Sequence, residues 1–283
     1  MIVQGITGKY GSAHTKLMME YGTNIVAGVT PGKGGQKFDN KIPIYDSVKD
    51  AVDNSGAQIS IMFVPAKFFL SAAKEALDSG IKLLVAIPEH VPIRDAMEAI
   101  ELAKQKNAII IGPNTPGVII PNLIKVGIMP ASPFSLGRIA VLSKSGTLLY
   151  EISNNLTSAG FGQSITIGIG GDPVNGTRMI DAFDMIKDDP ELEGIVIVGE
   201  IGGDSEEILA QHIIDTDFKK PIVGYVAGRR APKEKRMGHA GAIVMGTYGS
   251  AESKITMFTK ANIPVAKRPG EIAILLAGKM NSQ

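Results

Sequence analysis

The sequence predicts an α/β fold built on parallel sheets and arranged as two domains. Three observations support this prediction. Short β-branched segments alternate with longer amphipathic segments along most of the 283 residues. Several of the short segments are apolar throughout, which is typical of strands that helices cover on both faces. Glycine is also frequent, with 33 residues, well above the average share of about 7%, and several glycines fall in turns that follow these strands.

Two series of strands are expected, with helices between consecutive strands. The first series is Ile2–Ile6, Asn24–Val29, Gln58–Val64, Lys82–Ile87 and Ala108–Ile111. The second series is Arg138–Leu142, Ser164–Ile169, Gly194–Val198, Pro221–Val226 and Ile263–Val265. The connecting helices are clearest at Ala66–Ser79 and Ile93–Lys106, where apolar residues recur at intervals of three and four.

A stretch rich in proline and glycine separates the two series. It carries Pro113, Pro116, Pro121, Pro130 and Pro133 before Gly137, and this composition predicts a connector with little regular structure. We therefore expect one domain over residues 1–128 and a second over residues 129–283, each of ordinary domain size.

Composition excludes several classes of protein. A hydrophobic content of 44% excludes intrinsic disorder, and a formal charge of +1 offers no basic excess for binding nucleic acid or an anionic membrane. The chain has no cysteine, so disulfides, thiolate nucleophiles and Cys-ligated metals are excluded. No metal site is expected. The first residues show neither an export signal nor a membrane-spanning run, and we expect a cytoplasmic protein.

The first strand leads into the glycine-rich turn Gly5–Gly11, with a helix expected from about Ser12. Such a turn brings backbone N–H groups close to a phosphate, although the G-x-x-G-x-x-G spacing also suits a turn that serves packing alone. After the second strand, Lys33 stands where an NAD site would need an acid, and the first acid that follows is Asp39. This lysine favours a ligand with an additional phosphate, either CoA with its 3′-phosphate or NADP. The chain contains no P-loop.

The second half offers two further turns for an anion. Ser143–Thr147 and Gly170–Gly176 each follow an expected strand, and each is expected to present small residues and N–H groups at the start of a helix. Ordinary turn chemistry is the alternative interpretation of each.

Among the four histidines, His239 is the strongest candidate for chemistry. It lies between small residues in Lys235–Gly241, where its ring nitrogens are approachable, and a nucleophilic or acid–base role competes with that of a solvated loop residue. Glu200 ends an expected strand and is a candidate for orienting an imidazole. We expect His14 and His212 to be structural or exposed, and His90 to be a possible neighbour of a ligand pocket.

Seven segments, taken in order, resemble the α subunit of succinyl-CoA synthetase, also called succinate–CoA ligase, over essentially the whole chain. They are Gln4–Gly8, Gly28–Gly35, Ile111–Asn114, Ser145–Leu148, Gly168–Pro173, Gly199–Gly203 and Lys235–Gly241. The sequence departs from the family pattern at Thr115, where cysteine is usual, at Leu149, where threonine is common, and at Pro88–His90.

The resemblance implies a Rossmann-like CoA-binding domain followed by a flavodoxin-like domain that carries a phosphohistidine. It places the CoA site at Thr7, Gly8, Lys9, Tyr10, Lys33, Ile87, Pro88 and Glu89. It assigns the phosphohistidine to His239, the acid that steadies it to Glu200, and substrate or phosphate contacts to Tyr150, Ser145, Gly146, Gly171 and Asp172.

The implied reaction is the reversible formation of succinyl-CoA from succinate, CoA and a nucleoside triphosphate, through an acyl phosphate. The resemblance further implies a β subunit that holds the nucleotide with Mg, in an αβ or α2β2 assembly. Three alternatives stay open: a malate–CoA or other acid–CoA ligase, a CoA-binding regulatory protein without catalysis, and an NADP-dependent oxidoreductase.

Overall fold

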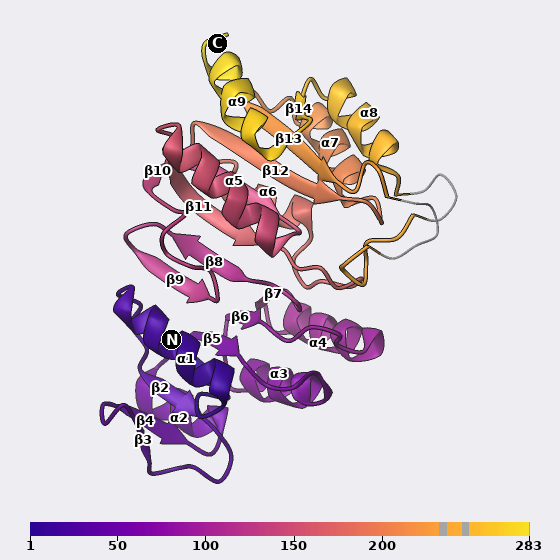
Figure 1. Ribbon diagram of the computed structural model, residues 1–283. Coiled ribbons are helices and arrows are strands. Elements are labelled where there is room, and N and C mark those ends of the chain that lie inside the picture. Colours follow the sequence, from indigo (N-terminus) through magenta and orange to yellow (C-terminus); the bar gives the residue numbers. More distant parts are fainter. Residues whose placement is uncertain (232–236, 245–248, 283) are drawn as a thin grey trace. The chain divides into compact units, whose positions relative to one another are not determined.

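The computed structural model describes residues 1–231, 237–244 and 249–282, which divide into two compact units (Figure 1). The first unit comprises Met1–Gly117, Leu123–Ile128 and Val174–Thr177, and the second comprises Val118–Asn122, Met129–Pro173 and Arg178–Gln283. The prediction of an α/β protein with largely parallel sheets is confirmed. The division into independent domains at residues 128 and 129 stays a prediction.

The first unit is built on a seven-stranded sheet with the order β3-β4-β2-β1-β5-β6-β7. Its parallel strands are β1 (Ile2–Gln4), β2 (Ala27–Val29), β4 (Ile42–Tyr45), β5 (Ile59–Met62), β6 (Leu83–Ala86) and β7 (Ile109–Ile111). The edge strand β3 (Lys37–Phe38) runs antiparallel to β4. In β1 all three residues are buried, because helices cover both faces of the sheet.

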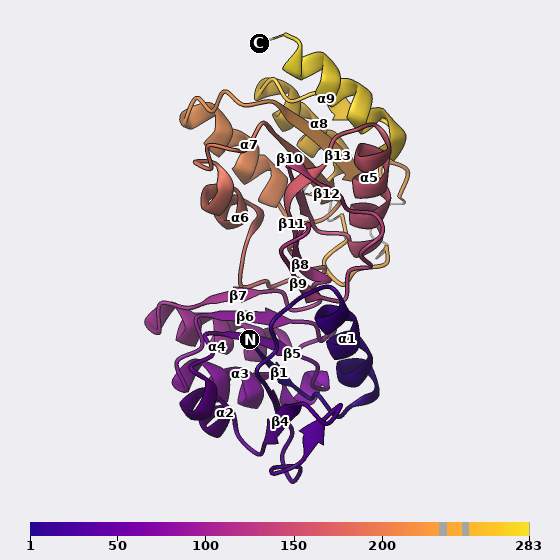
Figure 2. The ribbon, with the colours of Figure 1, turned by 90° about the vertical axis from the view of Figure 1, so that its left-hand side faces the viewer.

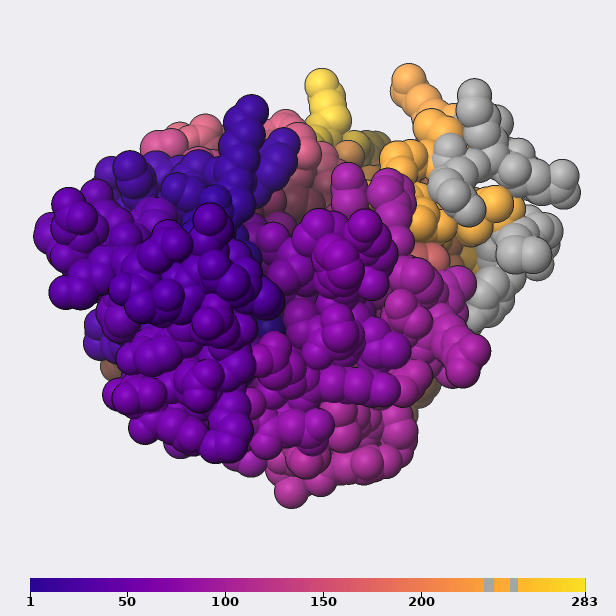
Figure 3. Space-filling model, turned by 90° about the horizontal axis from the view of Figure 1, so that it is seen from below, coloured from indigo at the N-terminus to yellow at the C-terminus, as the bar shows by residue number. Residues whose placement is uncertain are grey.

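Helix α1 (Lys9–Glu20) lies on one face of this sheet and helices α2 (Val48–Ser55), α3 (Phe69–Asp78) and α4 (Ile93–Gln105) lie on the other (Figure 2). A short 3-10 helix, Ala66–Phe68, leads into α3. Helix α3 buries Phe69 and Leu77 in the core, and α4 buries a row of alanines against it. The space-filling view of the chain shows the indigo N-terminal residues of this unit beside its purple residues, which come later in the sequence (Figure 3).

The second sheet has the order β14-β13-β12-β10-β11-β8-β9. Its strands are β8 (Gly117–Ile120), β9 (Ile124–Gly127), β10 (Leu136–Ser143), β11 (Gln163–Gly168), β12 (Gly194–Glu200), β13 (Ile222–Ala227) and β14 (Val265–Ala266). The five strands from β10 to β14 are parallel, and β8 runs antiparallel to β11. All seven residues of the central strand β12 are buried.

Helices also cover both faces of the parallel strands in the second unit. Helices α5 (Gly146–Ser158) and α9 (Ile272–Met280) lie on one face, and α6 (Met179–Ile186), α7 (Ser205–Asp215) and α8 (Ala251–Lys260) on the other (Figures 1 and 2). A 3-10 turn, Pro269–Glu271, precedes α9. Each buried Val, Leu or Ile side chain in such a core contributes roughly 1.5–3 kcal/mol relative to an exposed one. Across the described ranges, none of the helices is long and apolar enough to cross a bilayer.

The expectations for the start of the first helix and for the proline-rich stretch are wrong. The first helix begins at Lys9 rather than near Ser12, because Gly8 is already its N-cap. The stretch rich in proline is not irregular, because it contains β8, β9 and the start of β10. Its prolines fall outside these short strands, where they remove no hydrogen bond from the ladder.

Candidate functional site

His239 and Glu200 form a close pair in the second unit. Nδ1 of His239 lies 2.7 Å from a carboxylate oxygen of Glu200. Glu200 is the last residue of β12, so its side chain leaves the sheet at the carboxyl end of the central strand, where ligands bind in open α/β sheets. The side chain of His239 is 29% exposed and that of Glu200 is 10% exposed. The ring is therefore accessible to solvent, while the carboxylate behind it is largely buried.

The contact with Glu200 determines the tautomer and the pKa of the His239 imidazole. Its hydrogen bond to Glu200 raises the pKa of His239 above the ordinary value, and burial opposes this rise only in part. In the neutral ring, the Glu200 carboxylate accepts a hydrogen bond from Nδ1–H, which leaves the lone pair on Nε2. The arrangement presents Nε2 as a nucleophile.

Gly171 and Asp172 form a second wall of the site. A Cβ added at Gly171 would lie 2.5 Å from Cγ of His239, so only glycine permits the ring to lie there. The backbone N–H of Gly241 donates to the carbonyl of Gly171 at 3.3 Å, which joins the loop of His239 to this wall. Asp172 is buried, and its charge adds to the rise in the pKa of His239.

Ser145 is the N-cap of α5. Its side-chain oxygen accepts a hydrogen bond from the N–H of Leu148, and the helix begins at Gly146, within the expected turn Ser143–Thr147. The first N–H groups of a helix attract anions. Tyr150 is half-buried on the same helix, and burial raises the pKa of its hydroxyl to about 12. Tyr150 therefore stays neutral at physiological pH.

The second glycine-rich turn differs from the expectation. Gly170–Gly176 does not open a helix, because α6 begins only at Met179. Val174–Thr177, within and just after this turn, belongs to the first unit rather than the second. The turn contributes Gly171 and Asp172 to the site through its backbone path and not through a helix N-terminus. The basic residues Lys235 and Arg236 lie outside the described residues.

A buried ionic cluster adjoins the pair, and sequence analysis missed it. The carboxylate of Glu206 lies 2.5 Å from the ammonium of Lys254 and 3.2 Å from that of Lys144, and it accepts the backbone N–H of Glu200 at 3.1 Å. Lys254 also pairs with Glu207 at 2.9 Å. Glu206 and Glu207 resemble the ordinary first-turn acids of a surface helix, so no local signal in the sequence indicates their burial.

The candidate CoA turn lies in the first unit, at the carboxyl ends of β1 and β2. The parallel register sets Gln4 beside Val29, and Thr7 and Thr30 then meet at 3.2 Å between their hydroxyl oxygens. A Cβ added at Gly11 would lie 2.2 Å from the carbonyl oxygen of Gly5, so α1 approaches the turn only because this residue is glycine. Lys9 and Tyr10 are exposed in the first turn of α1, beside Gly8.

Lys33 lies in the turn after β2, on the same edge of the sheet. Its backbone N–H donates to the carbonyl of Thr30 at 3.1 Å, and its side chain is exposed. Ile87 and Pro88 follow β6 at this edge, and Pro88 is buried while Glu89 is exposed. The structure thus places the predicted CoA residues at the carboxyl ends of three parallel strands, with the side chains of Lys33 and Lys9 exposed.

Each of the other three histidines has its own surroundings. His14 lies in α1 and stacks on Phe63 with ring centroids 5.8 Å apart, and burial lowers its pKa. His212 lies in α7 and pairs with Asp184 at 2.8 Å. His90 is exposed in a left-handed conformation after Glu89, and its predicted place beside a ligand stays a prediction.

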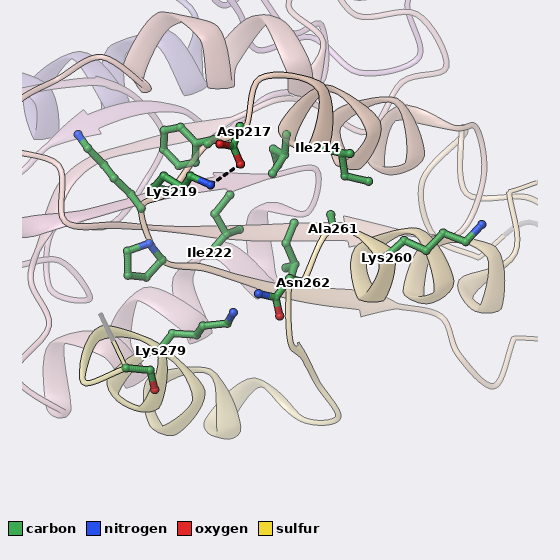
Figure 4. A pocket seen from close by; sticks show the side chains of 14 residues that line it. Ile214, Asp217, Lys219, Ile222, Lys260, Ala261, Asn262 and Lys279 are labelled. Carbon is green, nitrogen blue, oxygen red and sulfur yellow. Dashed lines mark hydrogen bonds and ion pairs between the residues drawn. The ribbon is translucent and has the colours of Figure 1, made fainter.

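A cavity of about 490 Å³ lies at the opposite end of the second sheet, next to the start of β13 (Figure 4). The carboxyl-terminal ends of α7, α8 and α9 border it, with Lys219, Lys260 and Lys279 among its lining residues. Lys219 pairs with Asp217 inside it, while Lys260 points away. The cavity therefore lies apart from His239 and Glu200 and forms no part of their site.

Two family models match the chain, one in each half. Residues 1–90 match the family described as CoA binding domain, and residues 142–262 match the family described as CoA-ligase. The first match includes every residue of the candidate CoA turn, and the second includes both His239 and Glu200.

Two curated proteins and two solved structures are similar over nearly the whole chain. "Succinate–CoA ligase [ADP-forming] subunit alpha 2" of Archaeoglobus fulgidus is 49% identical over 98% of this chain and 96% of its own length. The corresponding alpha subunit of Aquifex aeolicus is 49% identical over 98% of this chain and 91% of its own. ATP citrate lyase of Methanothrix soehngenii superposes with a TM-score of 0.89 at 23% identity, over 99% of this chain and 49% of that one. A dinucleotide-forming acetyl-coenzyme A synthetase of Ca. Korarchaeum cryptofilum superposes with a TM-score of 0.73 at 21% identity, over 94% of this chain and 58% of that one.

The two structures support the fold alone, and the chain spans only about half of each of them. The curated relatives match in length as well as in sequence. This chain belongs to the family of succinate–CoA ligase α subunits.

Proposed function

We propose that this chain binds CoA and carries a phosphoryl group on His239 while it works with a β subunit as a succinate–CoA ligase. The observation that carries the proposal is the pair of His239 and Glu200, 2.7 Å apart at the carboxyl end of β12, within a chain of this family. Its relatives are named succinate–CoA ligase [ADP-forming], and succinate, CoA and an NDP-forming reaction are proposed for this chain on that basis.

The neutral imidazole suits the phosphoryl transfer. Nδ1–H donates to Glu200, so the lone pair on Nε2 attacks phosphorus, and the positive charge that develops on the ring is stabilised by the carboxylate. Because the ring is held against Gly171, little reorientation is needed before attack.

Each proposed step forms one bond and breaks another. In the direction of ligation, Nε2 forms a bond to the γ-phosphorus of the nucleoside triphosphate while the bond to the diphosphate oxygen breaks. A carboxylate oxygen of succinate then takes the phosphoryl group, and the Nε2–P bond breaks. The CoA sulfur, after losing its proton to solvent, attacks the carbonyl carbon of the acyl phosphate, and inorganic phosphate leaves.

The phosphoryl dianion needs positive partners, because Glu200 and Asp172 both face the ring. The N-terminus of α5, at Ser145 and Gly146, supplies helix N–H groups for this purpose. Such a terminus contributes roughly 0.3–1 kcal/mol at a surface, and up to about 2 kcal/mol where it is partly buried. Tyr150, neutral on the same helix, is proposed to hydrogen-bond the substrate.

The first unit is proposed to hold CoA. Thr7, Gly8, Lys9 and Tyr10 surround the start of α1, and backbone N–H groups there suit a phosphate. Lys33 is proposed to meet the 3′-phosphate, and Ile87, Pro88 and Glu89 to border the same ligand at the end of β6.

The nucleotide and its Mg are proposed to bind the β subunit, because this chain contains no P-loop. The assembly is proposed to be an αβ or α2β2 hetero-oligomer in the cytoplasm.

The proposal is tested by the stability of the labelled protein. The complex of this chain with the co-expressed β subunit is incubated with γ-labelled nucleotide and then treated with acid or alkali. A phosphohistidine loses its label in acid and keeps it in alkali, because protonation makes imidazole a good leaving group, whereas a phosphoserine at Ser145 survives acid. Label that persists in His239→Ala would exclude the proposed role.

A panel of carboxylic acids separates succinate from the alternatives. The complex is assayed with succinate, malate and longer dicarboxylates in the presence of CoA and ATP or GTP. A higher kcat/KM for malate than for succinate would assign the chain to a malate–CoA ligase with the same residues.

A further inference from the structure

We infer that Glu206 is a positioning residue of the His239 site, which joins the backbone of Glu200 to the ammonium of Lys144 through one buried carboxylate. This inference rests on the proposed function and deepens it. It assigns a role to a group that contacts neither His239 nor the solvent.

The geometry of Glu206 is unusual for a residue in the first turn of a helix. Its side chain is fully buried at the start of α7 and turns back toward the end of β12. A Cβ added at Gly199 would lie 2.6 Å from Cγ of Glu206, so the side chain packs directly on the strand residue before Glu200. Its carboxylate then accepts the N–H of Glu200 at 3.1 Å.

Two lysines share this carboxylate. Lys254 of α8 is completely buried, lies 2.5 Å from Glu206, and donates to the carbonyl of Gly203 at 2.9 Å. Lys144, between β10 and α5, lies 3.2 Å from Glu206 and keeps 13% of its side chain exposed. Burial alone would raise the pKa of Glu206, but the charges of Lys144 and Lys254 outweigh it and lower the pKa. The carboxylate is therefore ionised.

Lys144 links the buried ionic cluster to the His239 site. Lys144 directly precedes Ser145, the N-cap of α5, and its positive charge acts on His239. In the described part of the chain, the charges of Glu200 and Asp172 raise the pKa of His239 and the charge of Lys144 lowers it. Among the described residues Lys144 is thus a cation that can compensate a phosphoryl group on Nε2, and Glu206, at 3.2 Å, holds it away from Glu200.

Glu207 provides a matched control. It is the neighbouring residue on α7, has the same side chain and pairs with the same Lys254 at 2.9 Å. Within the described ranges the ion pair of Glu207 is with Lys254 alone, whereas Glu206 also binds Lys144 and the N–H of Glu200. A Glu→Gln change at either position removes one charge from the cluster, but only the change at Glu206 disturbs the Glu200 backbone and Lys144.

The test measures the pKa of His239 by NMR of the full chain labelled in its four histidines, with His239→Ala used for assignment. In Glu206→Gln we expect this pKa to fall by at least about 0.5 unit, because Lys144 then competes with His239 for Glu200. In Lys144→Met we expect the pKa to rise, because a positive charge is lost. In Glu207→Gln we expect a change below about 0.2 unit.

Phosphoryl transfer in the complex with the β subunit supplies the second measurement. Labelling of His239 is expected to slow about tenfold in Glu206→Gln and in Lys144→Met, and to stay within about twofold of wild type in Glu207→Gln. Equal effects of Glu206→Gln and Glu207→Gln on both readouts would overturn the inference.

If Glu206→Gln does not fold, Glu206→Gln/Lys254→Met removes one buried charge of each sign, and the same fall in the pKa of His239 is expected from it. An unchanged pKa in this double variant overturns the inference. The pKa is measured on the chain without its partner. Failure of His239 to accept label in the wild type therefore counts against the proposed function and leaves this test intact.

Discussion

Nδ1 of His239 lies 2.7 Å from the carboxylate of Glu200, across 39 residues of sequence. The contact depends on two features that the sequence places separately: the carboxyl end of the buried strand β12, which carries Glu200, and the wall at Gly171, which leaves room for the ring. Together they turn an ordinary imidazole into one with a defined tautomer and a raised pKa.

Replacing the carboxylate changes the pH dependence of the reaction. In Glu200→Gln the hydrogen bond keeps an acceptor but loses its charge, so the pKa of His239 falls toward its ordinary value. Neutral His239 is the nucleophile, and its fraction grows as the pH rises through its pKa. We therefore expect the rising limb of the pH profile to move to lower pH in the variant, and the plateau rate to fall about tenfold or more because charge-assisted hydrogen bonds contribute roughly 1.5–3 kcal/mol.

The measurement is the initial rate of His239 labelling between about pH 5.5 and about pH 8.5, the range in which histidine titrates. An NMR titration of the ring accompanies it. Asp184→Asn is the control, because it removes a carboxylate from His212 and not from His239. If the rising limb of the pH profile lies at the same pH in Glu200→Gln as in the wild type, Glu200 does not determine the protonation of His239.

A methyl group at Gly171 is expected to displace the ring. In Gly171→Ala the new Cβ would lie 2.5 Å from Cγ of His239, so the imidazole must move away from Glu200. We expect labelling to fall by at least about 100-fold, since small misplacements of a reacting group are costly. The thermal midpoint, measured by circular dichroism, is expected to change little.

Gly241→Ala is the matched control for that change. Its added Cβ would lie 3.5 Å from the nearest atom, Cα of Pro173, which is an ordinary contact. Activity close to wild type in Gly241→Ala, beside a large loss in Gly171→Ala, assigns the effect to the ring. Equal losses would point to the loop as a whole.

The parallel sheets and the pair of His239 and Glu200 were predictable from local patterns. Strands such as β12 are apolar along their whole length, and this pattern is read directly from neighbouring residues. Glu200 ends that strand and His239 lies between Gly238 and Ala240, so each is a candidate on its own.

The features that the sequence did not reveal depend on distant partners. Strand β8 is four residues long and pairs with β11, so the prolines around it dominate the local pattern. Gly11 lies inside α1, where glycine costs about 1 kcal/mol relative to alanine, and the helix start was therefore placed too late. The contacts of Glu206 with Lys144 and Lys254 span 62 and 48 residues, and burial together with the contacts to Lys144 and Glu200 distinguishes this acid from Glu207.

Lys33 is expected to distinguish CoA from its dephosphorylated form. Calorimetry of the full chain should show 3′-dephospho-CoA binding about tenfold more weakly than CoA, which corresponds to about 1.4 kcal/mol. Lys33→Met is expected to abolish this difference, because the ammonium at the end of β2 no longer meets the 3′-phosphate.

Lys41→Met removes an exposed lysine from the nearby turn between β3 and β4, and it is expected to leave the preference intact. Tighter binding of NADPH than of CoA by the wild type would assign the turn at Thr7–Tyr10 to a dinucleotide instead.

The isolated chain is expected to bind neither ATP nor GTP at micromolar concentrations, because it contains no P-loop and its His239 site offers a phosphoryl acceptor rather than a nucleotide pocket. Titration of the purified chain with each nucleotide and Mg should give no saturable heat, while CoA binds to the same preparation. Addition of the β subunit should restore both nucleotide binding and labelling of His239. Labelling of the chain alone, at a rate near that of the complex, would contradict a nucleotide site on the partner and would require the triphosphate to bind beside the N-terminus of α5.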